Sequence, residues 1–223
     1  GYYEELIDRC YRDCDHLSLS VTLYSNGTIN KEIVASVTES LKLSEDGARL
    51  KEVFAAPSLQ MVTFTLTEKG YAIQNDAHDF LPDYKADMEN GPESCRSFFG
   101  KLAALCLGRV RAGLSPLALV SLDNCSDNGV RLERAMRYMT QSWMNHGFIT
   151  EDEYFALIKK NTYPLSMIDK ITPHPDERIA KALTEDGVEG AQPFVTAKGT
   201  VGAIYVNSEN PHYLLIENAF PNG

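Results

Sequence analysis

The sequence predicts an α/β fold with a largely parallel sheet, helices on both faces, and short antiparallel strands near the C-terminus. Strand-like runs alternate with helix-like patterns through residues 1–160, as in sheets whose strands are joined by crossover helices. The run 116–122 (PLALVSL) is almost wholly apolar, which is typical of a parallel strand covered on both faces. Beyond residue 170 the pattern changes to one short helix followed by short strands.

The first third of the chain reads as strands with one helix between them. The dipeptide Asn26-Gly27 favours a type I′ hairpin turn, so the runs on either side of it are predicted to pair. A run rich in β-branched and aromatic residues then predicts a strand that stops at Glu68-Lys69-Gly70. The predicted strands are 17–24, 32–38 and 61–67, and the predicted helix is 45–54.

The middle of the chain is predicted to be helical on both sides of the apolar strand. Pro92 opens a pattern with apolar residues three and four positions apart, and a second such pattern follows Gly129. Thr150 and Glu153 have the spacing of a capping box before a third helix, which reaches about Lys160. Residues 74–91 are predicted to be a loop. The C-terminal elements are predicted as a helix at 173–185 and strands at 194–197, 201–206 and 212–217.

Composition excludes several classes of function. The formal charge of −10 and the pI near 5.0 argue against nucleic-acid or anionic-membrane partners, which need clustered Lys and Arg. No apolar run approaches the roughly 20 residues of a membrane span. The five cysteines form no CxxC pair and the five histidines no HxxxH or HExxH pattern, so neither a disulfide framework nor a metal site is predicted. A reduced cytoplasmic setting is the expectation.

Polar residues follow two of the predicted strands where each strand ends. Thr67-Glu68 closes one strand and Asp123-Asn124 closes the next. In parallel α/β sheets ligands bind at the carboxyl ends of strands, so both pairs are candidate ligand contacts. Asp127 and Asn128 are assigned to a turn and to the cap of the following helix. From spacing alone, turn chemistry explains all of these residues equally well.

Asp169 is a further candidate because it lies between Ile168 and Lys170. It can form a surface ion pair with Lys170, which contributes little stability. It can also be a partly desolvated carboxylate that orients a substrate. The residues themselves leave both readings open.

Three motifs in order resemble the mannitol dehydrogenase family of polyol-specific long-chain dehydrogenases. They are TFTLTEKGY (63–71), VSLDNCSDNG (120–129) and YPLSMIDKITP (163–173), and YLLIENAFPNG (213–223) is similar to the segment before the family's helical domain. The resemblance implies a Rossmann-type dinucleotide-binding domain followed by an α-helical domain. It also implies a metal-free reaction that interconverts a polyol or sugar acid with its keto sugar. The cofactor that the resemblance implies is NAD, with NADP as the alternative.

The resemblance assigns roles to individual residues. It implies that Asn124 and Asp169 are catalytic, and that Glu68, Thr67 and Asp123 lie at the cofactor. The family's asparagine and arginine in FPNSMVDR are Leu165 and Lys170 here. Neither the family's glycine-rich phosphate turn nor its lysine base, in K-x-x-x-x-N-x-x-H, occurs in this chain.

The chain is therefore expected to be an incomplete dinucleotide-binding domain, 1–223, with a small β-rich extension at 171–217, and to be inactive by itself. The leading expectation is a fructuronate reductase or D-mannonate oxidoreductase, and mannitol 2-dehydrogenase is the alternative. An alternative of another class is a non-catalytic nucleotide-binding or interaction domain. A zinc-dependent polyol dehydrogenase is disfavoured because Cys and His are not clustered.

Overall fold

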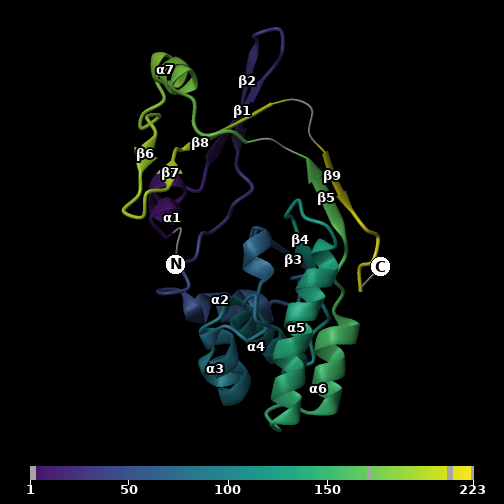
Figure 1. Cartoon of the computed structure of the whole chain (residues 1–223). Coiled ribbons are helices and arrows are strands. Elements are labelled where there is room, and N and C mark those ends of the chain that lie inside the picture. The colour runs from purple at the N-terminus through teal and green to yellow at the C-terminus, as the bar shows by residue number, and fades with distance from the viewer. Residues whose placement is uncertain (1–3, 170–171, 210–212, 222–223) are drawn as a thin grey trace. The chain divides into compact units, whose positions relative to one another are not determined.

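The computed structural model describes residues 4–169, 172–209 and 213–221. Its contacts divide the chain into two compact units. The first consists of Gly1–Leu50 and Asp169–Tyr213, and the second of Lys51–Ile168 and Leu214–Gly223. The colours of Figure 1 show that each unit draws on segments far apart in the sequence. Most of the predicted extension at 171–217 thus belongs with the N-terminal residues.

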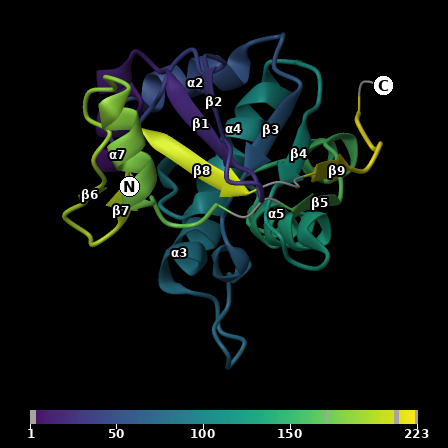
Figure 2. The same ribbon diagram turned by 90° about the horizontal axis from the view of Figure 1, so that it is seen from above.

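The first unit is built on a three-stranded sheet. Its order is β2-β1-β8, with β1 (Ser18–Leu23) in the centre (Figure 2). The strand β1 pairs antiparallel with β2 (Ile29–Val34) and parallel with β8 (Tyr205–Glu209). A hairpin therefore joins β1 to β2, as predicted. Its turn is not type I′, because among the turn residues only Gly27 has a positive φ, of 84°.

A small apolar core packs the C-terminal segment of this unit, Asp169–Tyr213, against its N-terminal segment, Gly1–Leu50. Val21 of β1 and Tyr205 of β8 pack with Ile179, Ala180 and Leu183 of the amphipathic helix α7 (Glu177–Glu185). Asp176 caps α7 by accepting a hydrogen bond from the Arg178 amide. The other elements are α1 (Glu4–Cys10), a 3₁₀ turn at Arg12–Cys14, and the antiparallel pair β6 (Phe194–Val195) and β7 (Val201–Gly202).

The second unit contains the parallel strands β3 (Met61–Phe64) and β4 (Ala118–Ser121). All four residues of β4 are buried, as its apolar run predicts. A parallel bridge to Thr162 extends the sheet on the far side of β4. The chain then forms β5 (Ser166–Asp169), an element that was not predicted, and β5 pairs with β9 (Tyr213–Ile216).

Helices surround these strands. The helices α5 (Asn128–Asn145) and α6 (Glu151–Phe155) lie side by side in Figure 1. The apolar face of α5 buries Leu132, Met136, Met139 and Trp143. The predicted capping box is present at Thr150 and Glu153. The remaining bounds are α2 (Gly47–Ala55), which spans both units, a 3₁₀ turn (Glu68–Tyr71), α3 (Pro82–Asn90), a 3₁₀ turn (Pro92–Ser94), α4 (Phe98–Arg111) and a π-helix (Ala156–Lys160).

Three predictions in this unit were wrong. The predicted loop at 74–91 contains α3. This helix adds little to the hydrophobic core, because its only buried residues are Asp87 and Met88. Asp87 is buried because its carboxylate accepts hydrogen bonds from the amides of Arg96 and Ser97, which lead into α4. The second error concerns Asn128, which is not the N-cap of α5, since Asp127 holds that position with a φ of 56°. The third is the start of α4, which was predicted at Pro92 but lies at Phe98, because Pro92–Ser94 form a separate 3₁₀ turn and Ser97 caps the helix. Within the described residues no helix is long and apolar enough to span a membrane.

Candidate active site

The carboxylate of Asp123 joins the ends of β3 and β4. The residue is 7% exposed, and its two carboxylate oxygens accept hydrogen bonds from the backbone amides of Leu66 and Thr67 at 2.8 and 2.9 Å. These amides lie two and three residues after the end of β3, and Asp123 lies two residues after the end of β4. Because the two strands are parallel, their carboxyl ends meet at one edge, as predicted.

Tyr71 completes the surroundings of this carboxylate. Its hydroxyl lies 2.6 Å from an oxygen of Asp123 and 2.6 Å from Oγ of Ser121. A carboxylate only accepts hydrogen bonds, so the single Tyr71 proton is donated to Asp123, and Ser121 can donate to the phenolic oxygen. Burial and the Asp123 carboxylate raise the pKa of Tyr71 above its ordinary value, so the hydroxyl remains a donor at neutral pH.

Thr67 adopts a backbone conformation that is rare for its residue type. Its φ is 63° and its ψ is 162°, a region occupied almost only by glycine. Such a conformation costs about 1–3 kcal/mol and persists only where neighbouring contacts impose it. Here the Thr67 amide is held by Asp123, and its carbonyl accepts a hydrogen bond from the Gly70 amide at 3.0 Å.

Asn128 ties the end of β4 to the start of β5. Its amide nitrogen donates to the carbonyl oxygen of Asp123 at 3.0 Å and to the carbonyl oxygen of Ser166 at 2.9 Å. Its oxygen accepts from the amides of Gly129 and Ser166 at 2.8 and 3.2 Å. The Ser166 hydroxyl in turn donates to the carbonyl of Ser121. The third motif is thereby fixed beside the second.

Gly129 is required where the two segments meet. A Cβ built on Gly129 would lie 2.3 Å from the carbonyl oxygen of Tyr163 and 2.9 Å from that of Pro164. Real Cβ contacts are not this short, so any side chain here would push the YPLS segment away from α5. The glycine of the second motif thus has a packing role.

The side chains of Asn124 and Glu68 remain exposed at this edge. Arg131 of α5 forms an ion pair with Glu68 at 3.4 Å, and its Nε donates to the carbonyl oxygen of Ser126 at 2.9 Å. The Asn124 carboxamide, directly after Asp123, offers both a donor and an acceptor to a ligand. The structure therefore separates the predicted cluster into a buried pair, Asp123 and Asn128, and exposed groups.

An open groove of about 660 Å³ begins beside Glu68 and Tyr71. It runs along the first turns of α5 and includes Asp127, Arg131 and Arg134. Arg134 is exposed and has no ion pair within the described residues, whereas Arg131 is shared with Glu68. The groove is also lined by Ala72, Ile73, Gln74, Asn75, His78, Val130, Ala135 and Tyr138.

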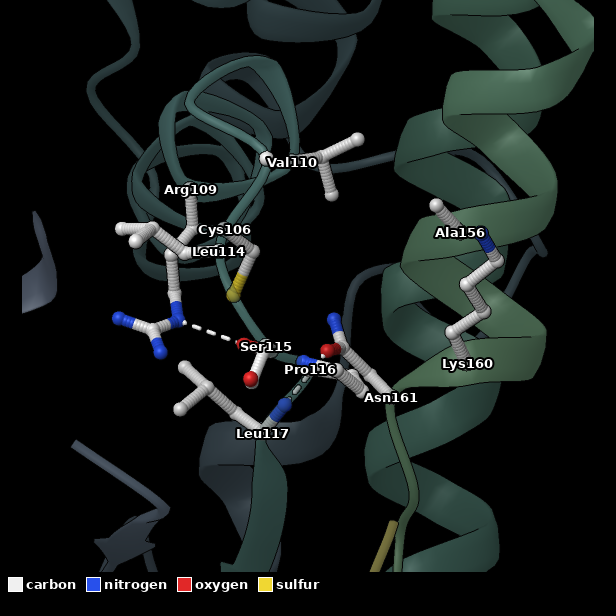
Figure 3. A pocket seen from close by; sticks show the side chains of 11 residues that line it. Cys106, Arg109, Val110, Leu114, Ser115, Pro116, Leu117, Ala156, Lys160 and Asn161 are labelled. Carbon is white, nitrogen blue, oxygen red and sulfur yellow. Dashed lines mark hydrogen bonds between the residues drawn. The ribbon is translucent and has the colours of Figure 1, made fainter. Parts of the chain in front are cut away.

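A second cavity, of about 200 Å³, lies at the amino end of β4 and is shown in Figure 3. Arg109 lines it, but its guanidinium donates to four carbonyl oxygens, those of Phe54, Ala56, Leu59 and Ser115. Asn161 accepts from the Leu117 amide at 2.9 Å. These polar groups are occupied in holding loops together, and the cavity is at the opposite end of β4 from the motifs.

Asp169 is the exposed last residue of β5 and is grouped with the first unit. Lys170, its predicted ion-pair partner, lies outside the described residues. The catalytic role of Asp169 stays a prediction, as do the roles of Asn124, Thr67, Glu68 and Asp123. Within the described residues no group of three or more His, Cys, Asp and Glu side chains could hold a metal ion.

Comparison with known proteins identifies relatives of the chain. No family model matches it. It is 44% identical over 222 residues to D-mannonate oxidoreductase of Thermotoga maritima, covering 98% of this chain and 41% of that protein. It is 31% identical over 187 residues to mannitol 2-dehydrogenase of Pyrenophora tritici-repentis, covering 82% of this chain and 32% of that protein. The chain belongs to the mannitol dehydrogenase family. It spans less than half the length of these curated relatives.

Solved structures confirm the fold class. Substrate-free D-sorbitol dehydrogenase superposes with a TM-score of 0.80 at 21% identity, covering 100% of this chain and 42% of that chain. The Pseudomonas fluorescens mannitol 2-dehydrogenase complex with NAD and D-mannitol gives a TM-score of 0.77 at 24% identity, covering 100% of this chain and 43% of that chain. The chain therefore has the Rossmann-like α/β fold of a polyol dehydrogenase domain, as predicted.

Sequence reasoning missed four residues of this edge: Tyr71, Ser121, Ser166 and Arg131. Tyr71 was visible in the TEKGY motif, but only the fold shows that its hydroxyl reaches Asp123. Ser121 and Ser166 carry no signal beyond their places in two motifs. Arg131 lies three residues after Asn128 on a helix, so its position on the Glu68 side could be inferred only with both elements in place.

Proposed function

We propose that the protein containing this chain is an NAD-dependent oxidoreductase that interconverts D-mannonate and its keto sugar acid, fructuronate. The observation that carries the proposal is the 44% identity to D-mannonate oxidoreductase across 98% of the chain, including the three motifs that converge at one edge of the sheet. The chain itself is proposed to supply an incomplete dinucleotide-binding domain.

The residues at the sheet edge fit a nicotinamide cofactor and a hydroxylated substrate. Both carboxylate oxygens of Asp123 are occupied by backbone amides, so the groups available to ligands are Asn124, Glu68 and Thr67. These three residues would border the nicotinamide end of the cofactor, and the catalytic role of Asp169 is retained as part of the proposal. When bound, NAD supplies the hydride acceptor for oxidation of the alcohol.

Asn124 is proposed to orient the reacting oxygen. A carboxamide N–H can donate a hydrogen bond to the carbonyl oxygen that forms as the substrate alcohol loses its proton and hydride. Its position is fixed by Asp123, because this neighbouring residue is anchored at three points to the segment that follows β3. The proton acceptor is expected, from the family resemblance, to be a lysine outside this chain.

The substrate class is supported by the groove beside Glu68. A sugar acid carries a carboxylate, which is best recognised by an arginine. Arg134 offers a guanidinium that no described carboxylate neutralises, and Arg131 lies one turn earlier on α5. The alternative substrate is mannitol, supported by the mannitol 2-dehydrogenase relative at 31% identity.

Partners and setting follow from charge and cysteine chemistry. The net charge of −10 supports a small-molecule partner over nucleic acid or an anionic membrane. The five cysteines are free thiols in the structure, which supports a reducing, cytoplasmic setting.

The test is a substrate panel with the purified full-length protein. NADH formation should occur with D-mannonate and exceed that with D-mannitol. Asn124→Ala should lower kcat by about 100-fold, the usual loss on removing one hydrogen-bond donor to a developing oxyanion. Turnover of mannitol alone would support the second substrate. Cofactor binding without turnover of either would support a non-catalytic domain and contradict the proposal.

A further inference from the structure

The segment after β3 is held in a strained shape by groups that come from β4 and its own turn. Thr67, a β-branched residue, has a φ of 63° and a ψ of 162°. Branching at Cβ makes this region especially unfavourable for threonine. The adjacent residue Glu68 is one of the exposed groups of the candidate active site and is 70% exposed as a side chain. Strain directly beside a functional edge is the pattern found where backbone geometry serves a site.

The contacts that impose this shape form a closed set. Asp123 accepts from two consecutive amides, those of Leu66 and Thr67. The Tyr71 hydroxyl, four residues beyond Thr67, donates to the same carboxylate at 2.6 Å. Both flanks of the Thr67-Glu68 corner are therefore anchored to one side chain. Asp123 is 7% exposed and Tyr71 is also 7% exposed, so water does not compete for these hydrogen bonds.

We propose that Asp123 and Tyr71 are positioning residues that hold Thr67 in its left-handed conformation and thereby direct Glu68 at the reacting groups. Neither residue contacts the substrate in this scheme. Asp123 thus acts through the corner it holds, which differs from the direct cofactor contact that the family resemblance implied for it. The proposal rests on the proposed oxidoreductase function for its kinetic consequence, but its structural part is independent of it.

The strain supplies the key test, because glycine adopts a positive φ without cost and alanine does not. Tyr71→Phe removes one hydroxyl of the anchor and should lower kcat about tenfold with little change in KM, since displacement of a catalytic corner acts on the chemical step. Adding Thr67→Gly should restore most of that loss, because the corner then needs less support. Adding Thr67→Ala should restore much less, since it removes the branching at Cβ but keeps a residue for which this positive φ is unfavourable.

Tyr84→Phe is the control for loss of another tyrosine hydroxyl, on a residue that is half-buried. Tyr84 lies in α3, and burial raises the pKa of its hydroxyl to about 12, but it lines neither the groove nor the Asp123 anchor. This variant should lower the unfolding midpoint without changing kcat at temperatures where the protein is folded. If Tyr71→Phe behaves in the same way, or if Thr67→Ala rescues as well as Thr67→Gly, the positioning role is wrong.

Amide hydrogen exchange provides the readout that does not depend on activity. In the full-length protein, exchange at Leu66 and Thr67 should be faster in Tyr71→Phe and in Asp123→Asn than in Tyr84→Phe. Unchanged exchange at these two amides would overturn the proposal even if the enzyme is active. If exchange is faster in Tyr71→Phe and Asp123→Asn but the wild-type protein turns over neither mannonate nor mannitol, the anchor is upheld and the proposed function is rejected.

Discussion

The side chain of Asn128 and the backbone of Ser166 are hydrogen bonded in both directions. The Asn128 amide nitrogen donates to the Ser166 carbonyl at 2.9 Å, and its oxygen accepts from the Ser166 amide at 3.2 Å. This pairing imitates that of two adjacent strands, although one partner is a side chain. It is the connection that places the segment leading into β5 beside the end of β4.

Replacing Asn128 should therefore destabilise the fold. Asn128→Ala removes the acceptor of the Ser166 amide and one of the two hydrogen bonds to the Asp123 carbonyl, which also accepts from the Cys125 amide. We expect a loss of about 3 kcal/mol in unfolding free energy. Urea unfolding of the full-length protein followed by circular dichroism measures this. Asn145→Ala, at the exposed far end of the same helix, is the control and should stay within about 0.5 kcal/mol of wild type. Equal effects of the two variants would contradict the assigned tie.

Gly129 should not tolerate a methyl group. In Gly129→Ala the new Cβ would lie 2.3 Å from the Tyr163 carbonyl oxygen, and the backbone must move to relieve the overlap. We expect destabilisation of about 2 kcal/mol or more in the same unfolding experiment. Gly108→Ala in α4 is the matched control, because no atom lies within 4 Å of its Cβ. That change should stabilise by up to about 1 kcal/mol, as alanine favours a helix interior. A neutral Gly129→Ala would show that the close approach is not needed.

Tyr71 should give the protein an alkaline instability. Its pKa is raised in the folded state by burial and by Asp123, so folding favours the protonated hydroxyl. The resulting stability is fully present below the unfolded-state pKa of about 10 and is lost as pH rises from there through the folded-state value. Unfolding midpoints at pH 8 and pH 11 should fall further in wild type than in Tyr71→Phe. Other buried tyrosines titrate in both proteins, so the difference isolates Tyr71. An identical fall in both proteins would be inconsistent with its bond to Asp123.

Arg134 should separate sugar-acid from polyol substrates. If its guanidinium binds the substrate carboxylate, Arg134→Gln should raise KM for D-mannonate about tenfold, equivalent to one charge-assisted hydrogen bond, and leave kinetics with an uncharged polyol unchanged. Steady-state kinetics of the full-length protein with both substrates measures the difference. Lys85→Gln removes the same charge from the exposed surface of α3 and should alter neither KM. A uniform rise for both substrates would assign Arg134 to general binding.

The sequence determined where most elements lie and which residue types close them. The apolar run before Ser121 became a fully buried strand, and the apolar spacing after Gly129 became the buried face of α5, because both patterns describe burial along a local period. The three motifs determined the family. By contrast, α3 was missed because a short helix with few buried apolar residues has almost no periodic signal.

Only the tertiary structure decided what the polar residues do. Asp123 reads as a residue aimed at a ligand, but folding brings it to amides 57 and 56 positions earlier in the chain. Asn128 reads as a helix cap, but it bonds to Ser166, 38 positions later. The positive φ of Thr67 is not predicted by residue type, since threonine resists it, and the folded chain holds it with Asp123 from β4 together with the turn's own Gly70 amide. Local propensity sets the energetic cost of each backbone conformation. Hydrogen bonds between strand ends that are distant in the sequence determine which unfavourable conformations are stabilised in the folded chain.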